Sequence, residues 1–258
     1  RPWLADAEFI VKAAAGRATC GTGARTAAIR AALPYSLTGA QERALDAILT
    51  DMASGERMLR LLQGDVGSGK TIVALLAMAA AVEAGRQAAL MAPTDILARQ
   101  HFDRLKPLCE AAGIRLAVLT GRSKGSERAA VLAGLADGSI DCVTGTHALF
   151  QDDVAFRDLA LAVVDEQHRF GVHQRLALSA KGEAADLLVM TATPIPRSLV
   201  LTYFGDMDVS ILDEKPAGRQ PIDTRTIPLA RLAEVTDAVG RALQEGQRVY
   251  WVCPLVEE

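Results

Sequence analysis

Two stretches of this sequence are apolar without interruption, and they restrict the possible fold more than any other feature. Residues 160–164 are Ala-Leu-Ala-Val-Val, and residues 187–190 are Leu-Leu-Val-Met. A strand with one side in water alternates apolar and polar residues, whereas these stretches indicate strands buried on both faces. Such strands are typical of a parallel sheet covered by helices. We therefore expect an α/β fold with a doubly wound parallel sheet and helices on both faces.

The rest of the chain alternates short apolar runs with longer helical patterns, as a doubly wound fold requires. Thr94 or Asp95 can cap one of these helices, and Gly85 and Gly138 can end two others. Polar motifs follow several strands at their carboxyl ends, where ligand-binding loops lie in this fold. The expected strands are 57–63, 88–92, 115–119, 141–144, 159–165 and 186–191, and the expected helices are 71–84, 95–109 and 126–136.

The N-terminal residues differ from the centre of the chain. Residues 1–30 are rich in alanine and contain a Gly-Thr-Gly break, so we interpret them as a helical and linker segment. The chain begins Arg-Pro-Trp, without methionine and without the layout of a signal peptide, and we expect it to be a piece of a longer protein. Residues 31–213 are then expected to form the main domain.

The C-terminal residues indicate a second domain. A stretch containing Pro and Gly follows Asp213 and is typical of a linker. A helix is expected at 231–244 and a strand at 248–252. We therefore interpret residues 214–258 as a linker and the beginning of a second domain that is truncated in this chain.

The composition excludes few functions. The net charge of −3 does not indicate a strongly basic nucleic-acid coat, but phosphate contacts need only a few well-placed donors. The four cysteines are scattered and form no Cys-x-x-Cys pair, which predicts reduced thiols in a cytoplasmic protein. No apolar run is long enough to cross a bilayer, so we expect no membrane partner.

Residues 64–71, Gly-Asp-Val-Gly-Ser-Gly-Lys-Thr, fit the phosphate-loop pattern G-x-x-x-x-G-K-[ST] between an expected strand and an expected helix. The glycines let successive N–H groups point at phosphate oxygens, and the helix adds the positive end of its dipole. Lys70 would place a charge on the outer phosphates of ATP, and Thr71 would offer its hydroxyl to Mg²⁺. The residues expected to bind the nucleotide here are Gly64, Asp65, Val66, Gly67, Ser68, Gly69, Lys70 and Thr71.

An acidic pair directly follows the expected strand 159–165. Asp165 is placed to hold Mg²⁺ opposite Thr71, and Glu166 is placed to polarise the water that attacks the γ-phosphate. With Lys70 these carboxylates form the predicted catalytic set. An Asp-Glu pair alone would usually be a solvated turn, but hydrolysis needs both parts, so the phosphate loop favours the functional interpretation. Zinc is not expected at His168, which has neither a nearby cysteine nor a helical partner spacing.

With Asp165-Glu166-Gln167-His168-Arg169-Phe170-Gly171-Val172, the chain resembles the superfamily 2 helicases and, within them, the RecG family of branch-migration helicases. The similarity runs from about Leu33 to the last residue. The resemblance implies that residues 31–213 are a RecA-like first motor lobe using ATP and Mg²⁺, and that 214–258 begin a second RecA-like lobe.

The same resemblance implies roles for further residues. Residues 33–41 look like the adenine-recognition element of the family, in which Gln41 would bond the edges of adenine and Tyr35 would stack on the base. Without the resemblance, this segment would be interpreted as a helix N-cap at Thr38. Hydrolysis would be coupled to DNA movement through Gln167, His168, Thr191 and Thr193. The implied DNA contacts are Pro93, Thr94, Gln100, Arg122, Thr146 and His147.

The implied function is that of an ATP-dependent DNA helicase or translocase that remodels stalled replication forks and Holliday junctions in recombination and repair. It would act as a monomer in the bacterial cytoplasm, at the nucleoid. Three alternatives stay open: a double-stranded DNA translocase of the transcription-repair coupling type, a nucleotide-gated DNA-binding module without turnover, and a small-molecule kinase. We expect this fragment alone to hydrolyse ATP very slowly, because an arginine finger from the second lobe accelerates hydrolysis on the order of 10³-fold or more.

Overall fold

The computed structural model describes residues 16–165, 185–193, 207–214 and 223–253. The chain divides into two compact units, Arg1–Ala217 and Gly218–Glu258, and each is described by itself. The proposed roles of 1–30, 31–213 and 214–258 stay predictions.

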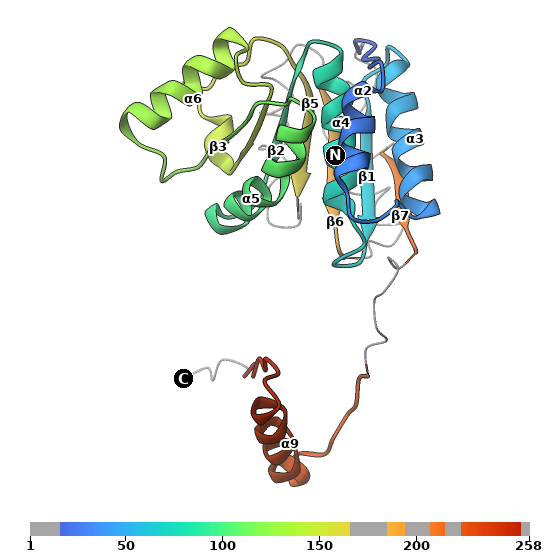
Figure 1. The fold of residues 1–258 in the computed structure, drawn as a ribbon, viewed down its shortest axis with the longest axis vertical. Coiled ribbons are helices and arrows are strands. Elements are labelled where there is room, and N and C mark those ends of the chain that lie inside the picture. Colours follow the sequence, from blue (N-terminus) through green and yellow to red (C-terminus); the bar gives the residue numbers. More distant parts are fainter. Residues whose placement is uncertain (1–15, 166–184, 194–206, 215–222, 254–258) are drawn as a thin grey trace, which may run out of the picture. The chain divides into compact units, whose positions relative to one another are not determined.

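The first unit is built on a seven-stranded sheet in the order β3-β4-β2-β5-β6-β1-β7 (Figure 1). Each pairing between neighbouring strands is parallel. The predicted α/β class with a parallel sheet is therefore confirmed. The strands are β1 (Leu59–Gly64), β2 (Gln87–Met91), β3 (Leu116–Leu119), β4 (Cys142–Gly145), β5 (Leu159–Asp165), β6 (Asp186–Thr191) and β7 (Asp208–Leu212).

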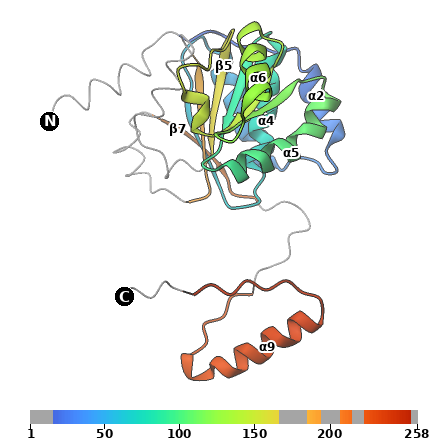
Figure 2. The same ribbon diagram turned by 90° about the vertical axis from the view of Figure 1, so that its left-hand side faces the viewer.

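Helices cover both faces of this sheet. One hydrophobic cluster joins α2, α3, α4 and α5 to one face, and Figure 2 shows α2, α4 and α5 on the same side of the strands. A second cluster joins α6 and η1 to the opposite face. The doubly wound arrangement follows from this two-sided cover. The helices are α2 (Ala24–Ala32), α3 (Gly39–Ala53), α4 (Lys70–Glu83), α5 (Asp95–Ala111), α6 (Gly125–Asp137) and the 3-10 helix η1 (His147–Phe150).

The apolar strands are buried on both sides, as predicted. In β5, Leu161 and Val163 pack into the first cluster, whereas Ala162 and Val164 pack into the second. None of these four side chains is more than 1% exposed. Burying one Val or Leu side chain stabilises a fold by about 1.5–3 kcal/mol, so these central strands anchor the loops at their ends.

Strand β7 was not expected from the sequence. It lies at the edge of the sheet beside β1, and its residues alternate between exposed Val209 and Ile211 and buried Ser210 and Leu212. An edge strand with one open face does not need an uninterrupted apolar run. The sequence signal that indicated β5 and β6 is therefore missing from β7.

Helix α2 has no N-cap side chain of its own and is capped by a residue from another helix. The carboxylate of Glu83, in the last turn of α4, accepts hydrogen bonds from the backbone N–H groups of Gly23, Arg25 and Thr26. A carboxylate at a helix N-terminus satisfies N–H groups that lack partners within the helix and complements the helix dipole. Glu83 therefore fastens the segment before the main domain to the end of α4.

The second unit contains η3 (Leu229–Arg231) and α9 (Leu232–Gln244), which confirms the helix predicted at 231–244. The strand predicted at 248–252 is wrong, because residues 247–253 are assigned to neither strand nor helix. A strand needs a neighbour for its hydrogen bonds, and the described residues 223–253 contain no other strand.

Two buried thiols lie in the first unit. Cys109 and Cys142 are buried, Cys20 and Cys253 are exposed, and all four are free. Burial raises the pKa of Cys109 to about 12 and also raises the pKa of Cys142, so neither is a reactive thiolate near neutral pH. Within the described parts of the chain, no helix combines the length and the apolar character that crossing a membrane requires.

Candidate nucleotide and nucleic-acid sites

The loop between β1 and α4 has a conformation that only glycine adopts easily. Gly67 and Gly69 have φ angles of 82° and 87°, in the left-handed region. A Cβ atom on Gly69 would lie 2.2 Å from Nε2 of Gln41, and one on Gly64 would lie 2.6 Å from Oγ of Ser68. The predicted phosphate loop is therefore tightly curved, and a Cβ atom at Gly64 or Gly69 would force a neighbouring side chain to move.

The start of α4 fits an anion. Gly69 is the N-cap residue of α4, so no side chain caps the first turn of this helix. Oγ of Ser68 is buried, and it has no hydrogen-bond partner among the residues that the structure describes. A buried hydroxyl without a partner costs about 1–3 kcal/mol. Phosphate oxygens placed against this loop would accept hydrogen bonds from the hydroxyl and from the helix start.

Lys70 is already held over the loop. Its Nζ donates hydrogen bonds to the carbonyl oxygens of Gly64 at 2.5 Å and Asp65 at 3.0 Å, and the residue is only 9% exposed. The ammonium group therefore lies at the mouth of the loop without extending into solvent. The adjacent Thr71 is half-buried, at the position where its hydroxyl was predicted to bind Mg²⁺.

A cavity of about 480 Å³ opens beside the phosphate loop and has the size of a small-ligand site. The loop supplies one wall, through Gly67, Gly69, Lys70 and Thr71. Tyr35 and its neighbours in the segment between α2 and α3 supply another, and α5 supplies a third. Sequence reasoning missed Arg104 of α5, which lines this cavity three residues after His101 and thus on the same side of the helix.

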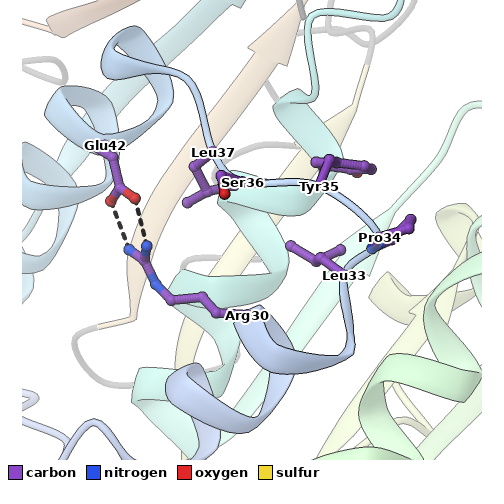
Figure 3. Close-up of a pocket in the computed structure, with 7 residues that line it drawn as sticks. All are labelled: Arg30, Leu33, Pro34, Tyr35, Ser36, Leu37 and Glu42. Carbon is purple, nitrogen blue, oxygen red and sulfur yellow. Dashed lines mark hydrogen bonds and ion pairs between the residues drawn. The ribbon is translucent and has the colours of Figure 1, made fainter. Parts of the chain in front are cut away.

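A second cavity, of about 470 Å³, is lined by residues 33–37 and by the helices that flank them (Figure 3). Arg30 of α2 binds Glu42 of α3 through two hydrogen bonds of 2.5 and 2.6 Å, and this pair braces the segment that carries Tyr35. The hydrogen bond from Arg30 lowers the pKa of Glu42. Both side chains are more than a third exposed, so this pair positions the segment more than it stabilises the fold.

Gln41 connects the N-terminus of α3 to the phosphate loop. Its Oε1 accepts from the backbone N–H of Thr38 at 2.9 Å, and its Nε2 donates to the carbonyl of Ser68 at 2.8 Å. The hydroxyl of Thr38 accepts the N–H of Gln41 in return, which confirms the N-cap at Thr38. The adenine contact of Gln41 stays a prediction, and it requires the carboxamide to leave at least one of these bonds.

Asp165 stands at the carboxyl end of β5, and β6 separates it from the phosphate loop at the end of β1. Two strand spacings place the two backbone ends about 10 Å apart, a gap that side chains, Mg²⁺ and phosphates can fill. Oδ2 of Asp165 lies 2.8 Å from Nε2 of His101, with both side chains largely buried. A carboxylate and a hydroxyl are ligands that Mg²⁺ prefers, so Asp165 and Thr71 fit the predicted metal role. Glu166, Gln167 and His168 lie outside the described residues.

Thr191 lies at the end of β6, between β1 and β5, the two strands that carry the predicted nucleotide-binding residues. It pairs in register with Gln63 of β1, and the preceding Met190 pairs with Asp165 of β5. The hydroxyl of Thr191 accepts the backbone N–H of Thr193 at 3.2 Å. Thr191 is buried and Thr193 is exposed. Their position fits the predicted coupling role, which stays a prediction.

The residues predicted to contact DNA follow β2, β3 and β4. The exposed Thr94 caps α5 by accepting the N–H of Leu97 at 3.3 Å, next to the half-buried Pro93. The side chain of Arg122 is 79% exposed, with its Nε 3.6 Å from a carboxylate oxygen of Asp95. The loops that carry these residues follow the carboxyl ends of their strands. The phosphate loop and Asp165 lie at the same edge of the sheet, but at the ends of β1 and β5.

The three other predicted DNA contacts differ in exposure. Gln100 and His147 are exposed, whereas Thr146 is buried and its hydroxyl accepts the N–H of Ala148 at 3.5 Å. The structure thus gives the side chain of Thr146 a capping role at the start of η1. DNA binding by these residues stays a prediction.

Comparison with known proteins agrees with this geometry. Residues 38–201, more than half of the chain, match the DEAD/DEAH box helicase family. The chain belongs to this family. It is 55% identical over 234 residues to the ATP-dependent DNA helicase RecG of Streptococcus pneumoniae, covering 91% of this chain and 35% of the relative. It is 53% identical over 226 residues to the RecG of Bacillus subtilis, covering 88% and 33%.

A solved structure of RecG bound to a three-way DNA junction matches with a TM-score of 0.81 and 43% identity. The match covers 95% of this chain and 32% of that one, and the chain spans about a third of the length of the curated relatives it matches. The predicted resemblance to RecG helicases and the RecA-like fold are confirmed. In this DEAD/DEAH box helicase chain, sequence reasoning had missed the contact of His101 with Asp165. The visible signal was a histidine at helical spacing between the apolar residues Ala98 and Leu105.

Proposed function

We propose that the protein containing this chain is an ATP-dependent DNA helicase or translocase that remodels branched DNA, including stalled forks and Holliday junctions, in recombination and repair. One observation carries the proposal. A glycine-dependent phosphate loop and a half-buried Asp165 stand on β1 and β5, while exposed polar groups follow β2, β3 and β4 at the same edge of one sheet. The matched relatives are named DNA helicases, and the matched structure holds a DNA junction.

The nucleotide would be held by the phosphate loop and the adjoining cavity. Lys70 would exchange its bonds to the loop carbonyls for the outer phosphates, and Tyr35 would stack on the base beside Arg104. Thr71 and Asp165 would hold Mg²⁺, which supplies charge neutralisation to phosphoryl transfer when bound. Glu166 would accept a proton from the attacking water.

The loops after β2, β3 and β4 would grip the phosphate backbone of one DNA strand. Arg122 offers an exposed guanidinium, and the loop at Thr94 offers backbone N–H groups and hydroxyls. Thr191, together with Gln167, His168 and Thr193, would report the nucleotide state to these loops. Alternating closure of two lobes would then move the protein along DNA.

The full-length protein should be assayed for ATP hydrolysis and strand displacement on a synthetic fork and on linear duplex. We expect DNA-stimulated hydrolysis and unwinding that favours the fork. Glu166→Gln should abolish turnover while leaving nucleotide binding intact. Binding without any turnover in the unaltered protein would instead support a nucleotide-gated clamp, and equal activity on linear duplex would support a translocase of the transcription-repair coupling type.

A further inference from the structure

The contact between His101 and Asp165 joins two parts of the molecule that the proposed function uses separately. Nε2 of His101 lies 2.8 Å from Oδ2 of Asp165, and the two side chains are 11% and 13% exposed. An ionised carboxylate only accepts hydrogen bonds, so Nε2 carries the proton in this contact. Oδ2 of Asp165 is thereby held by His101, which restricts the orientation of the whole carboxylate.

Helix α5 connects this contact to the loop of Pro93 and Thr94, where DNA is predicted to bind. The helix begins directly after the loop of Pro93 and Thr94, and His101 follows Thr94 by seven residues, about 10 Å along the axis. Ala98, His101, Leu105 and Cys109 form its buried face, and the stretch of helix from its N-cap Thr94 to His101 is uninterrupted and precedes Pro107. Arg104, one turn beyond His101, lines the cavity at the phosphate loop.

A histidine is an unusual side chain for the buried face of α5. Its neighbours on the buried face are Ala, Leu and Cys, and an apolar side chain would fill the same space without a polar group to satisfy. The polar group of His101 is instead directed at the carboxylate predicted to bind Mg²⁺. A bond of this kind fixes the orientation of a metal-binding carboxylate, which tunes the affinity for the metal.

We propose that His101 is a positioning residue, which orients Asp165 for Mg²⁺ and ties that orientation to the DNA loop at the start of α5. The inference rests on the proposed function, since it names how DNA and nucleotide sites communicate. When a DNA strand engages Pro93 and Thr94, a small displacement of α5 moves His101, and Asp165 moves with it. The strand thereby changes the metal site without touching the nucleotide.

Variants of the full-length protein separate this role from simple packing. His101→Gln can place its own Nε2–H near Asp165, whereas His101→Leu fills the space without a donor. Asp103→Asn, at an exposed position on the same helix, is the control. Three quantities should be measured: affinity for a fluorescent ATP analogue in Mg²⁺ and in EDTA, the Mg²⁺ concentration giving half-maximal hydrolysis with forked DNA, and the ratio of DNA-stimulated to basal hydrolysis.

We expect His101→Leu to raise the half-maximal Mg²⁺ concentration about tenfold or more, a typical loss for an outer partner of a metal ligand. Nucleotide affinity in EDTA should stay unchanged, and DNA stimulation should fall. His101→Gln should restore most of the native Mg²⁺ dependence and most of the DNA stimulation. Asp103→Asn should match the unaltered protein in both. If His101→Leu does not fold, His101→Asn replaces it, because its shorter side chain keeps polarity but does not reach Asp165.

Two outcomes would overturn the proposal. In the first, the variant without a donor keeps the native Mg²⁺ dependence and DNA stimulation. In the second, His101→Gln is as impaired as His101→Leu, which would assign His101 to packing alone. Failure of the proposed function itself is a different result, because the unaltered protein would then show no DNA-stimulated hydrolysis at all.

Discussion

The two halves of the central sheet prepare their ligand sites in opposite ways. At the ends of β1 and β5, Lys70, Gln41 and Asp165 are largely buried and already bonded to protein groups. At the ends of β2, β3 and β4, Arg122 and His147 are exposed. The half predicted to bind the nucleotide, called the nucleotide half below, thus has its polar side chains already held by protein groups. The half predicted to bind DNA keeps Arg122 and His147 exposed. A site that does chemistry benefits from the first arrangement, and a site that must release and rebind a strand benefits from the second.

The largest effect is expected from Lys70→Ala in the full-length protein. The ammonium predicted to contact the outer phosphates is lost, so hydrolysis should fall on the order of 10²-fold or more while DNA affinity without nucleotide is preserved. Steady-state ATPase assays measure the loss of hydrolysis, and DNA titrations without nucleotide measure the DNA affinity. Lys106→Ala, at an exposed lysine of α5, is the matched control. If Lys70→Ala lost DNA affinity as strongly as hydrolysis, the two halves of the sheet would not have separate roles.

Gly69→Ala should abolish ATP binding by changing the backbone conformation of the phosphate loop. A left-handed φ costs an alanine about 1–2 kcal/mol, and the new Cβ would also meet Nε2 of Gln41 at 2.2 Å. Gly55 has a φ of 79°, but a Cβ atom there would have no neighbour within 4 Å, so Gly55→Ala carries the strain without the clash. Calorimetry should find both variants destabilised, with ATP binding lost only in Gly69→Ala. Unchanged binding there would show that the loop tolerates a wider shape.

Asp186→Asn tests how the burial of a carboxyl group in the nucleotide half affects the stability of the fold, separately from any catalytic role. Burial raises the pKa of Asp186, at the amino end of β6, to about 7, although its side chain accepts the N–H of Met58. Because the folded pKa lies above the unfolded one, the protonated acid contributes stability below about pH 4, and this contribution is lost as pH rises through 7. Asparagine keeps the acceptor without the charge, so the variant should gain on the order of 1–2 kcal/mol relative to the native chain at pH 8. Denaturant unfolding at pH 5 and pH 8 measures the difference, and a gain that is independent of pH would contradict the assignment.

The smallest effect is expected on the exposed half. Arg122→Ala should weaken fork binding only a few-fold and reduce the salt slope of binding by about one, with turnover at saturating DNA unchanged. Asp95→Asn removes the carboxylate beside Arg122 and should shift affinity in the opposite direction. Fluorescence anisotropy over a series of salt concentrations measures both. A change of the same sign in the two variants would exclude Arg122 as a phosphate contact.

Sequence reasoning succeeded where one local signal decides the structure. The uninterrupted apolar run of β5 required two-sided burial, and the glycines at 64–69 required a curved loop. It failed where structure depends on a distant partner. The N-cap of α2 comes from Glu83 in another helix, and His101 finds Asp165 through the sheet order. The strand expected at 248–252 has the right composition but no neighbour among residues 223–253.

The cap that Glu83 provides has a mechanical meaning. Helix α4 is about 20 Å long. Lys70 of the predicted phosphate loop lies at its first residue, and Glu83, whose carboxylate caps α2, lies at its last. The residues that lead into α2 are thus attached to the C-terminal end of α4, opposite the end that carries Lys70. We therefore expect a force on the segment before α2 to act on α4, the helix whose other end begins at the predicted phosphate loop.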